Sequence, residues 1–193
     1  MNRFLLLPLL LLSLNLAYSQ ESEHKTVLTA PEGWRPEIIN LPLGFAPSID
    51  YTGFEDIRFA PGWSDTTAHD YFTYTFTWVL DQNPKLDQEK LESQMKDYFD
   101  GLMAAVSERD DLPKTEANFN FSKAKRDFGA TGEITFYEAF FKKKVITLNV
   151  NVAGKNCPKT KKYMVRFELS PTSKNDPLWK KFSEVKLNSD CGN

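Results

Sequence analysis

The chain has few of the residues on which catalytic and metal sites most often depend. Its 193 residues include two histidines and two cysteines. The sequence holds no Gly-x-Ser-x-Gly nucleophile turn, no phosphate-binding glycine loop, no dinucleotide glycine fingerprint and no zinc-protease histidine pair. A hydrolytic triad would have to take its base from His24 or His69. The sequence therefore predicts no cofactor and no metal, and it favours a protein that is not an enzyme without deciding the question.

The chain also lacks an excess of charge of either sign. It carries 24 Lys and Arg residues against 26 Asp and Glu residues, for a net charge of −2. A protein that binds a phosphate backbone needs a strong positive field, so a nucleic-acid partner is disfavoured. Beyond residue 19 no apolar stretch approaches the roughly 20 residues of a membrane-spanning helix, so no membrane span is expected there.

The first residues are typical of a cleavable export signal. Arg3 precedes an apolar run over residues 4–16, and the small residues Ala17 and Ser19 follow it. The run of about 13 residues is shorter than the roughly 20 that span a bilayer. We therefore expect residues 1–19 to be a signal peptide and the product to be periplasmic or secreted. Residues 20–30 are then expected to be a flexible lead, and residues 31–193 a single domain with a proline-rich N-terminal strap.

The two cysteines, Cys157 and Cys191, both follow the predicted signal. In an oxidising compartment a disulfide between them is the expected state. The alternative is a pair of unlinked thiols. A metal pair is less expected, because two cysteines without nearby histidines cannot complete a tetrahedral site.

Apolar periodicity predicts one strand followed by one long helix. Over residues 71–80 aromatic residues alternate with threonines, which is the period of a strand with one buried face. After Pro84 the apolar spacing changes to steps of three and four from Leu91 to Val106, which predicts an amphipathic helix. Asp87 is its expected N-cap.

Four further strands are expected at residues 119–124, 134–141, 145–152 and 163–169. Asp176 and Pro177 predict the N-cap and first turn of a short C-terminal helix. Turns rather than helical crossovers join these strands, so the expected fold class is α+β. The expected architecture is an antiparallel sheet of about five strands with one long amphipathic helix packed on it and a short C-terminal helix.

Candidate site residues are few. His69 lies between Asp65 and Asp70, and together they could form a metal or acid–base site; the competing interpretation is a polar loop that uses such residues for turns. Trp34 and Trp63 could line a ligand groove, although packing in the core or the strap is the favoured explanation. Two lysine clusters, one at residues 142–144 and one at residues 159–162, would form an anion-binding rim if both lay at one end of the sheet.

Two segments resemble a known family. Residues 57–63 (IRFAPGW) with the aromatic strand that follows, and residues 169–179 (LSPTSKNDPLW), are similar to an uncharacterised family of exported Bacteroidetes-type bacterial proteins. This resemblance implies an exported compartment and no particular activity. The order of elements is also similar to the PsbP and DcrB fold family, which implies an α/β/α sandwich as the alternative fold.

Two hypotheses of function follow. The first is an exported soluble binding or accessory domain that holds a small molecule, a glycan or a partner protein. It is motivated by the abundant aromatic residues and the missing catalytic motifs. The second is a small hydrolase or lyase centred on His69 with Asp65 and Asp70.

Overall fold

The computed structural model describes residues 26–124 and 127–188, and within them the protein is mostly β. In chain order the elements are β1 (Leu28–Thr29), β2 (Arg35–Leu41), β3 (Gly53–Phe59), β4 (Tyr74–Leu80), α1 (Gln88–Val106), β5 (Glu116–Ala124), β6 (Asp127–Glu138), β7 (Lys144–Cys157), β8 (Lys162–Ser170), the 3-10 helix η1 (Pro177–Glu184) and β9 (Lys186–Leu187). The predicted export signal lies outside the described residues.

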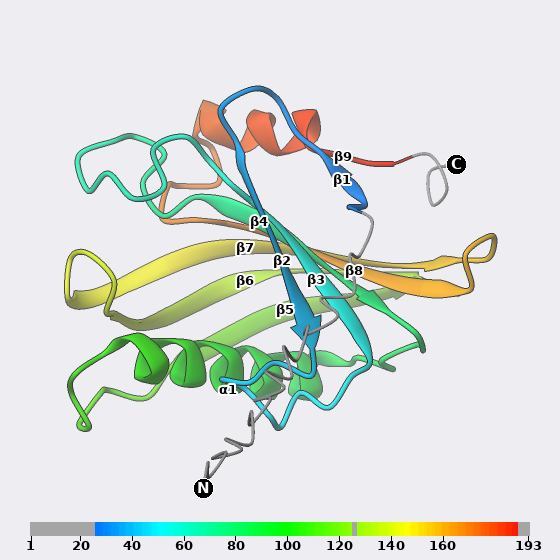
Figure 1. Cartoon of the computed structure of the whole chain (residues 1–193), viewed down its shortest axis with the longest axis horizontal. Helices are drawn as coiled ribbons and strands as arrows, with labels where there is room; N and C mark the ends of the chain where they lie inside the picture. The colour runs from blue at the N-terminus through cyan, green and yellow to red at the C-terminus, as the bar shows by residue number, and fades with distance from the viewer. Residues whose placement is uncertain (1–25, 125–126, 189–193) are drawn as a thin grey trace, which may run out of the picture.

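Seven strands form one antiparallel sheet in the order β2-β3-β4-β8-β7-β6-β5. β1 and β9 pair in a separate two-stranded ribbon. Helix α1 follows β4 in the middle of the sheet and returns the chain to the edge at β5. Figure 1 shows α1 beside β5 and β6, and η1 next to the β1–β9 ribbon. The two helices therefore cover different parts of the sheet.

The core lies between α1 and one face of the sheet. The predicted alternation of β4 puts Phe76 and Trp78 on this face, and both are fully buried. Phe76 stacks on Phe167 of β8 with 4.5 Å between ring centroids, and on Tyr98 of α1 with 5.4 Å. Aromatic pairs at such distances add about 0.5–1.5 kcal/mol each beyond the area that they bury. These contacts join the two central strands to the helix.

A buried charged pair holds β1 against the other face of the sheet. Asp56 of β3 accepts hydrogen bonds from the backbone N–H groups of Val27 at 2.7 Å and Leu28 at 3.0 Å. Arg58, two residues along the same strand, pairs with Asp56 and donates to the carbonyl oxygen of Leu28 at 2.6 Å. Residues 28–29 of the predicted flexible lead thus form a strand that is anchored to the sheet.

The α+β fold class expected from the sequence is wrong. The main sheet has seven strands instead of about five, and the two-stranded ribbon adds two more. The α/β/α sandwich fails for the same reason, because the described residues contain a single α-helix. The structure is a mostly-β fold with one α-helix and one short 3-10 helix.

Glycine accounts for strands that are longer than expected, and proline for a strand that was not expected. Gly132 and Gly154, which predict turns, lie inside β6 and β7. A Cβ at Gly154 would lie 1.9 Å from the ring of Phe128, and one at Gly132 would lie 2.6 Å from the ring of Phe119. These glycines therefore make room for aromatic rings within the sheet. Pro36 lies in β2, which tolerates it because β2 is an edge strand.

The described residues include only one of the two cysteines. Cys157 is buried at the end of β7, whereas Cys191 lies outside the described residues. The disulfide between them stays a prediction. In the described part of the chain no helix combines the length and apolar character of a membrane span.

A buried carboxyl group lies inside the aromatic core. Glu55 of β3 is fully buried and accepts hydrogen bonds from Trp78 Nε1 at 2.7 Å and from the Tyr98 hydroxyl at 2.9 Å. Burial raises the pKa of Glu55 to about 7 from its ordinary value of 4.5, although the two hydrogen bonds act in the opposite direction. The folded protein therefore binds this proton more tightly than the unfolded chain does.

We expect the stability that this proton contributes to be fully present below pH 4.5 and to be lost as the pH rises through about 7. Glu55→Gln keeps the side-chain shape and removes the ionisation. The free energy of unfolding of this variant relative to the unmodified protein should rise by up to about 3 kcal/mol between pH 4.5 and pH 8. Urea denaturation across this range measures the difference. Parallel pH profiles for the two proteins would contradict the assignment.

Candidate functional site

The structure places His69 on the surface and pairs it with a residue distant in sequence. Its side chain is 68 % exposed, and its Nε2 lies 2.9 Å from Oδ2 of Asp176, the N-cap residue of η1. The backbone N–H of Leu178 and then His69 lower the pKa of Asp176. His69 thus links the loop before β4 to the start of η1.

The two predicted acidic partners of His69 have other contacts. Asp65 accepts from the backbone N–H of Thr67 at 2.9 Å and from its hydroxyl at 2.7 Å, and these bonds lower the pKa of Asp65. Asp70 accepts from the backbone N–H of Gly62 at 3.2 Å. Both carboxylates therefore stabilise turns of the loop, and the structure does not bring them together with His69. No group of three or more His, Cys, Asp or Glu side chains in residues 26–124 and 127–188 is placed to hold a metal ion.

The two candidate tryptophans lie in packing clusters. Trp34 is half-buried and contacts Phe182 of η1, with 6.3 Å between ring centroids. Trp63 is half-buried among aromatic rings of the loop, β3 and the β6–β7 turn, the nearest being Phe59 at 4.6 Å and Phe141 at 5.1 Å. These contacts favour the packing interpretation for both residues.

The two lysine clusters lie at opposite ends of the sheet. Residues 142–144 lead into β7 and residues 159–162 follow it. Because β7 has 14 residues, about 45 Å separates its ends. Figure 1 shows the corresponding turns on opposite sides of the molecule. The two clusters therefore cannot form one anion-binding rim.

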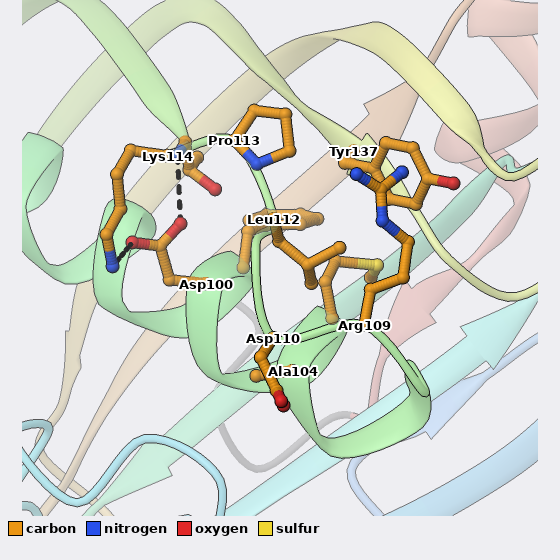
Figure 2. Close-up of a pocket in the computed structure, with 11 residues that line it drawn as sticks. Asp100, Ala104, Arg109, Asp110, Leu112, Pro113, Lys114 and Tyr137 are labelled. Carbon is orange, nitrogen blue, oxygen red and sulfur yellow. Dashed lines mark hydrogen bonds and ion pairs between the residues drawn. The ribbon is translucent and has the colours of Figure 1, made fainter.

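A first hollow lies between the C-terminal end of α1 and the segment that follows it (Figure 2). Its volume is about 270 Å³, slightly below the range of about 300–1,000 Å³ that is typical of ligand pockets. The polar side chains at its rim already have partners within the protein. Asp100 accepts from the backbone N–H of Thr115 and pairs with Lys114. Arg109 pairs with Asp111 and lies over the Tyr137 ring. This hollow is the weaker candidate.

A larger hollow of about 520 Å³ lies on the sheet face opposite α1. Six of its seven lining residues have polar side chains, and the residues come from three neighbouring strands and the segment after β8. The lining residues are Asn118, Asn120, Thr131, Gly132, Glu133, Asn149 and Lys174. We call this surface the asparagine face and include in it Asn151, which binds Lys174.

Strand register places the polar residues of the asparagine face in two rows across the sheet. In the first row Asn118 of β5 is opposite Glu133 of β6, which is opposite Asn149 of β7. In the second row Asn120 is opposite Thr131, which is opposite Asn151. Neighbours within a row lie about 4.8 Å apart, and the rows lie about 7 Å apart along the strands. The result is a regular array of amide, hydroxyl and carboxyl groups.

The segment after β8 forms one wall of this surface. Asn149 Nδ2 donates to the carbonyl oxygen of Thr172 at 3.1 Å. Lys174 Nζ donates to Oδ1 of Asn151 and lies 4.0 Å from the centre of the Trp179 ring. Burial lowers the pKa of Lys174 to about 8, although Glu168 and Glu133 act in the opposite direction.

The sequence does contain a signal for this surface. The segments Asn118-Phe119-Asn120 and Asn149-Val150-Asn151 each place two asparagines on one side of a strand and an apolar residue on the other. Asparagine is depleted in strands, so two such segments are unusual. Their approach across β6 could not be foreseen, because it depends on the order of the strands.

No protein-family model, curated protein or solved structure matches the chain. The resemblance to exported Bacteroidetes-type proteins and to the PsbP and DcrB family therefore stays a prediction.

The contact between His69 and Asp176 gives a direct test of the role of each residue. His69→Ala should change the free energy of unfolding by less than about 0.5 kcal/mol, because the side chain is mostly exposed. Asp176→Ala should destabilise more, because it also removes the N-cap of η1. Urea denaturation of the two variants makes the comparison. A loss for His69→Ala as large as that for Asp176→Ala would show that the histidine has a greater structural role.

Proposed function

We propose that the protein is an exported, non-enzymatic binding domain whose ligand lies on the asparagine face. The observation that carries this proposal is the placement of four asparagines, Asn118, Asn120, Asn149 and Asn151, on one face of β5 and β7. Residues that contradict the local preference of their element are expected at functional sites. Here the contradiction occurs four times on one face, and three of the four asparagines line the hollow.

The chemistry of this surface favours a polar ligand without net charge. Each asparagine amide offers two donors and one acceptor oxygen. The hollow contains one acidic side chain, Glu133, and one basic side chain, Lys174, whose charges balance. It offers no apolar side chain as an anchor and no concentrated field that would attract a polyanion.

The location of the surface leaves it accessible. Asn118, Asn120, Thr131 and Glu133 are all exposed. The half of this sheet face over β3, β4 and β8 is already covered. The buried charged pair of Asp56 and Arg58 holds β1 there, and η1 packs beside it. Arg166 of β8 donates to the carbonyl oxygens of Phe182 and Val185 at 2.7 Å. The half over β5, β6 and β7 is left for a ligand.

The hypothesis of a hydrolase or lyase at His69 has less geometric support. His69 lies mostly in solvent, its partner is the cap of η1, and Asp65 and Asp70 are held by turns. His69 does not line either of the hollows described above. We therefore propose the binding function alone.

The proposal predicts that a polar ligand stabilises the native state through the asparagine face. A thermal-shift screen of neutral oligosaccharides, polyols, amino acids and short peptides should find at least one class that raises the melting temperature, because a ligand of the folded state must do so. Asn118→Ala combined with Asn120→Ala should weaken binding by about tenfold or more, since each lost hydrogen bond costs about 0.5–1.5 kcal/mol. Ionic strength should have little effect.

Asn40→Ala is the matched control, because Asn40 is an exposed asparagine of β2, the strand at the opposite edge of the sheet. It should leave binding unchanged. The proposal is wrong if the double variant binds as tightly as the unmodified protein, or if no compound in the screen stabilises the protein.

A further inference from the structure

We infer that the ligand of the asparagine face is an uncharged oligosaccharide of about two or three sugar units that lies across the strands from β5 toward β8. This inference rests on the proposed function and adds the ligand's class, length and direction. It is carried by the arrangement of the two rows of polar side chains.

The rows define the direction and the length of the ligand. The side chains within each row are neighbours across β5, β6 and β7, so an elongated ligand that follows a row meets a polar group on each strand. The three strands span about 10 Å, and Lys174 with the segment after β8 closes the far end. A single sugar ring would reach only part of a row, and a long chain would extend past the edge strand β5.

The two rows also match the width and the hydrogen-bonding pattern of a sugar chain. The rows lie about 7 Å apart, so the exposed amides of Asn118 and Asn120 can approach a ligand between the rows from both sides. The amides of Asn149 and Asn151 already donate to Thr172 and Glu168 and can add weaker contacts at the wall. Sugar hydroxyls donate and accept, as do asparagine amides and the hydroxyl of Thr131. Hydroxyls on neighbouring ring carbons can therefore bind both ends of one amide group.

The remaining ligand classes fit less well. A peptide that extends a sheet needs a free strand edge, and the asparagine face lies on the flat of the sheet. Peptide side chains usually contribute apolar anchors, for which the hollow has no apolar partner among its lining residues. A free amino acid could pair with Glu133 and Lys174, but it would leave Asn118 and Asn120 without a role.

The basic side chain on this face already has contacts within the protein. Lys174 is held between Asn151 and the Trp179 ring, and Glu168 lies close enough to favour its charged form. Glu133 is exposed and can accept from hydroxyl groups. A neutral sugar can form hydrogen bonds with both Lys174 and Glu133 and adds no charge that would need a counter-charge.

The test is a titration of the ¹⁵N-labelled protein with neutral oligosaccharides of one to five units, built from glucose, galactose, mannose, xylose or N-acetylglucosamine. The side-chain amide signals of Asn118, Asn120, Asn149 and Asn151 report contact directly. For at least one sugar, we expect the affinity to increase from one unit to about three and then to level off. The dissociation constant should be on the order of 1 mM for the disaccharide, because only a few neutral hydrogen bonds form.

Two variants and two further probes complete the test. Asn118→Ala combined with Asn120→Ala should reduce the affinity for the trisaccharide about tenfold or more and that for the monosaccharide less, whereas Asn40→Ala should change neither. Glycine and a neutral tripeptide are titrated alongside the sugars. If one of these shifts the four amide signals and no sugar does, the oligosaccharide inference is wrong and the proposed binding function stands.

Three other outcomes are decisive. If no probe shifts the asparagine amides, the inference and the proposed function both fail. If sugars shift these signals with an affinity that does not depend on length, the assigned length and direction are wrong. If sugars bind but shift only signals outside the asparagine face, the site is wrong.

Discussion

The stacking of Phe76 between Phe167 and Tyr98 fixes which face of the sheet is buried. The orientation of the other strand residues follows from the orientation of Phe76. Side chains in a strand alternate between two faces, so a shift of one residue would exchange every inward and outward position. With Phe76 facing α1, strand register places Phe119 and Val150 on the same buried face. Their neighbours in sequence must then face the other way.

The asparagine face is the direct consequence of this alternation. Burial of Phe119 exposes Asn118 and Asn120, and burial of Val150 turns Asn149 and Asn151 to the same side as the asparagines of β5. A slip in register would bury four amides without partners, each at a cost of about 1–3 kcal/mol. Burial of the apolar side chains and solvation of the asparagine amides therefore both favour the same strand register.

Local patterns in the sequence predict individual elements better than they predict the fold. The β4 alternation and the Asp87 cap are readable because each depends on neighbours within a few residues. Gly132 and Gly154 mislead, because each lies in a strand opposite an aromatic residue of the neighbouring strand, which the local sequence does not show. The β2 strand is hidden for a similar reason, since only its edge position makes Pro36 acceptable.

The candidate site likewise combines a local pattern that the sequence shows with an arrangement that depends on the fold. The paired asparagines of β5 and β7 are visible in the sequence as two N-x-N segments, but 28 residues lie between Asn120 and Asn149. Only the order β7-β6-β5 places the two pairs on either side of the same strand, β6. The sequence around His69 predicts an acid–base site, but Asp65 and Asp70 accept hydrogen bonds from backbone groups of the loop instead.

His69 nevertheless has a connection to the asparagine face. Its partner Asp176 begins η1 and lies two residues after Lys174, which binds Asn151 at the wall of the hollow. The segment between β8 and η1 is thus held at one end by His69 and at the other by the asparagine face, with Trp179 of η1 packed against Lys174. These contacts share one short segment, so the physical link between His69 and the wall of the asparagine face runs through the backbone of residues 170–176.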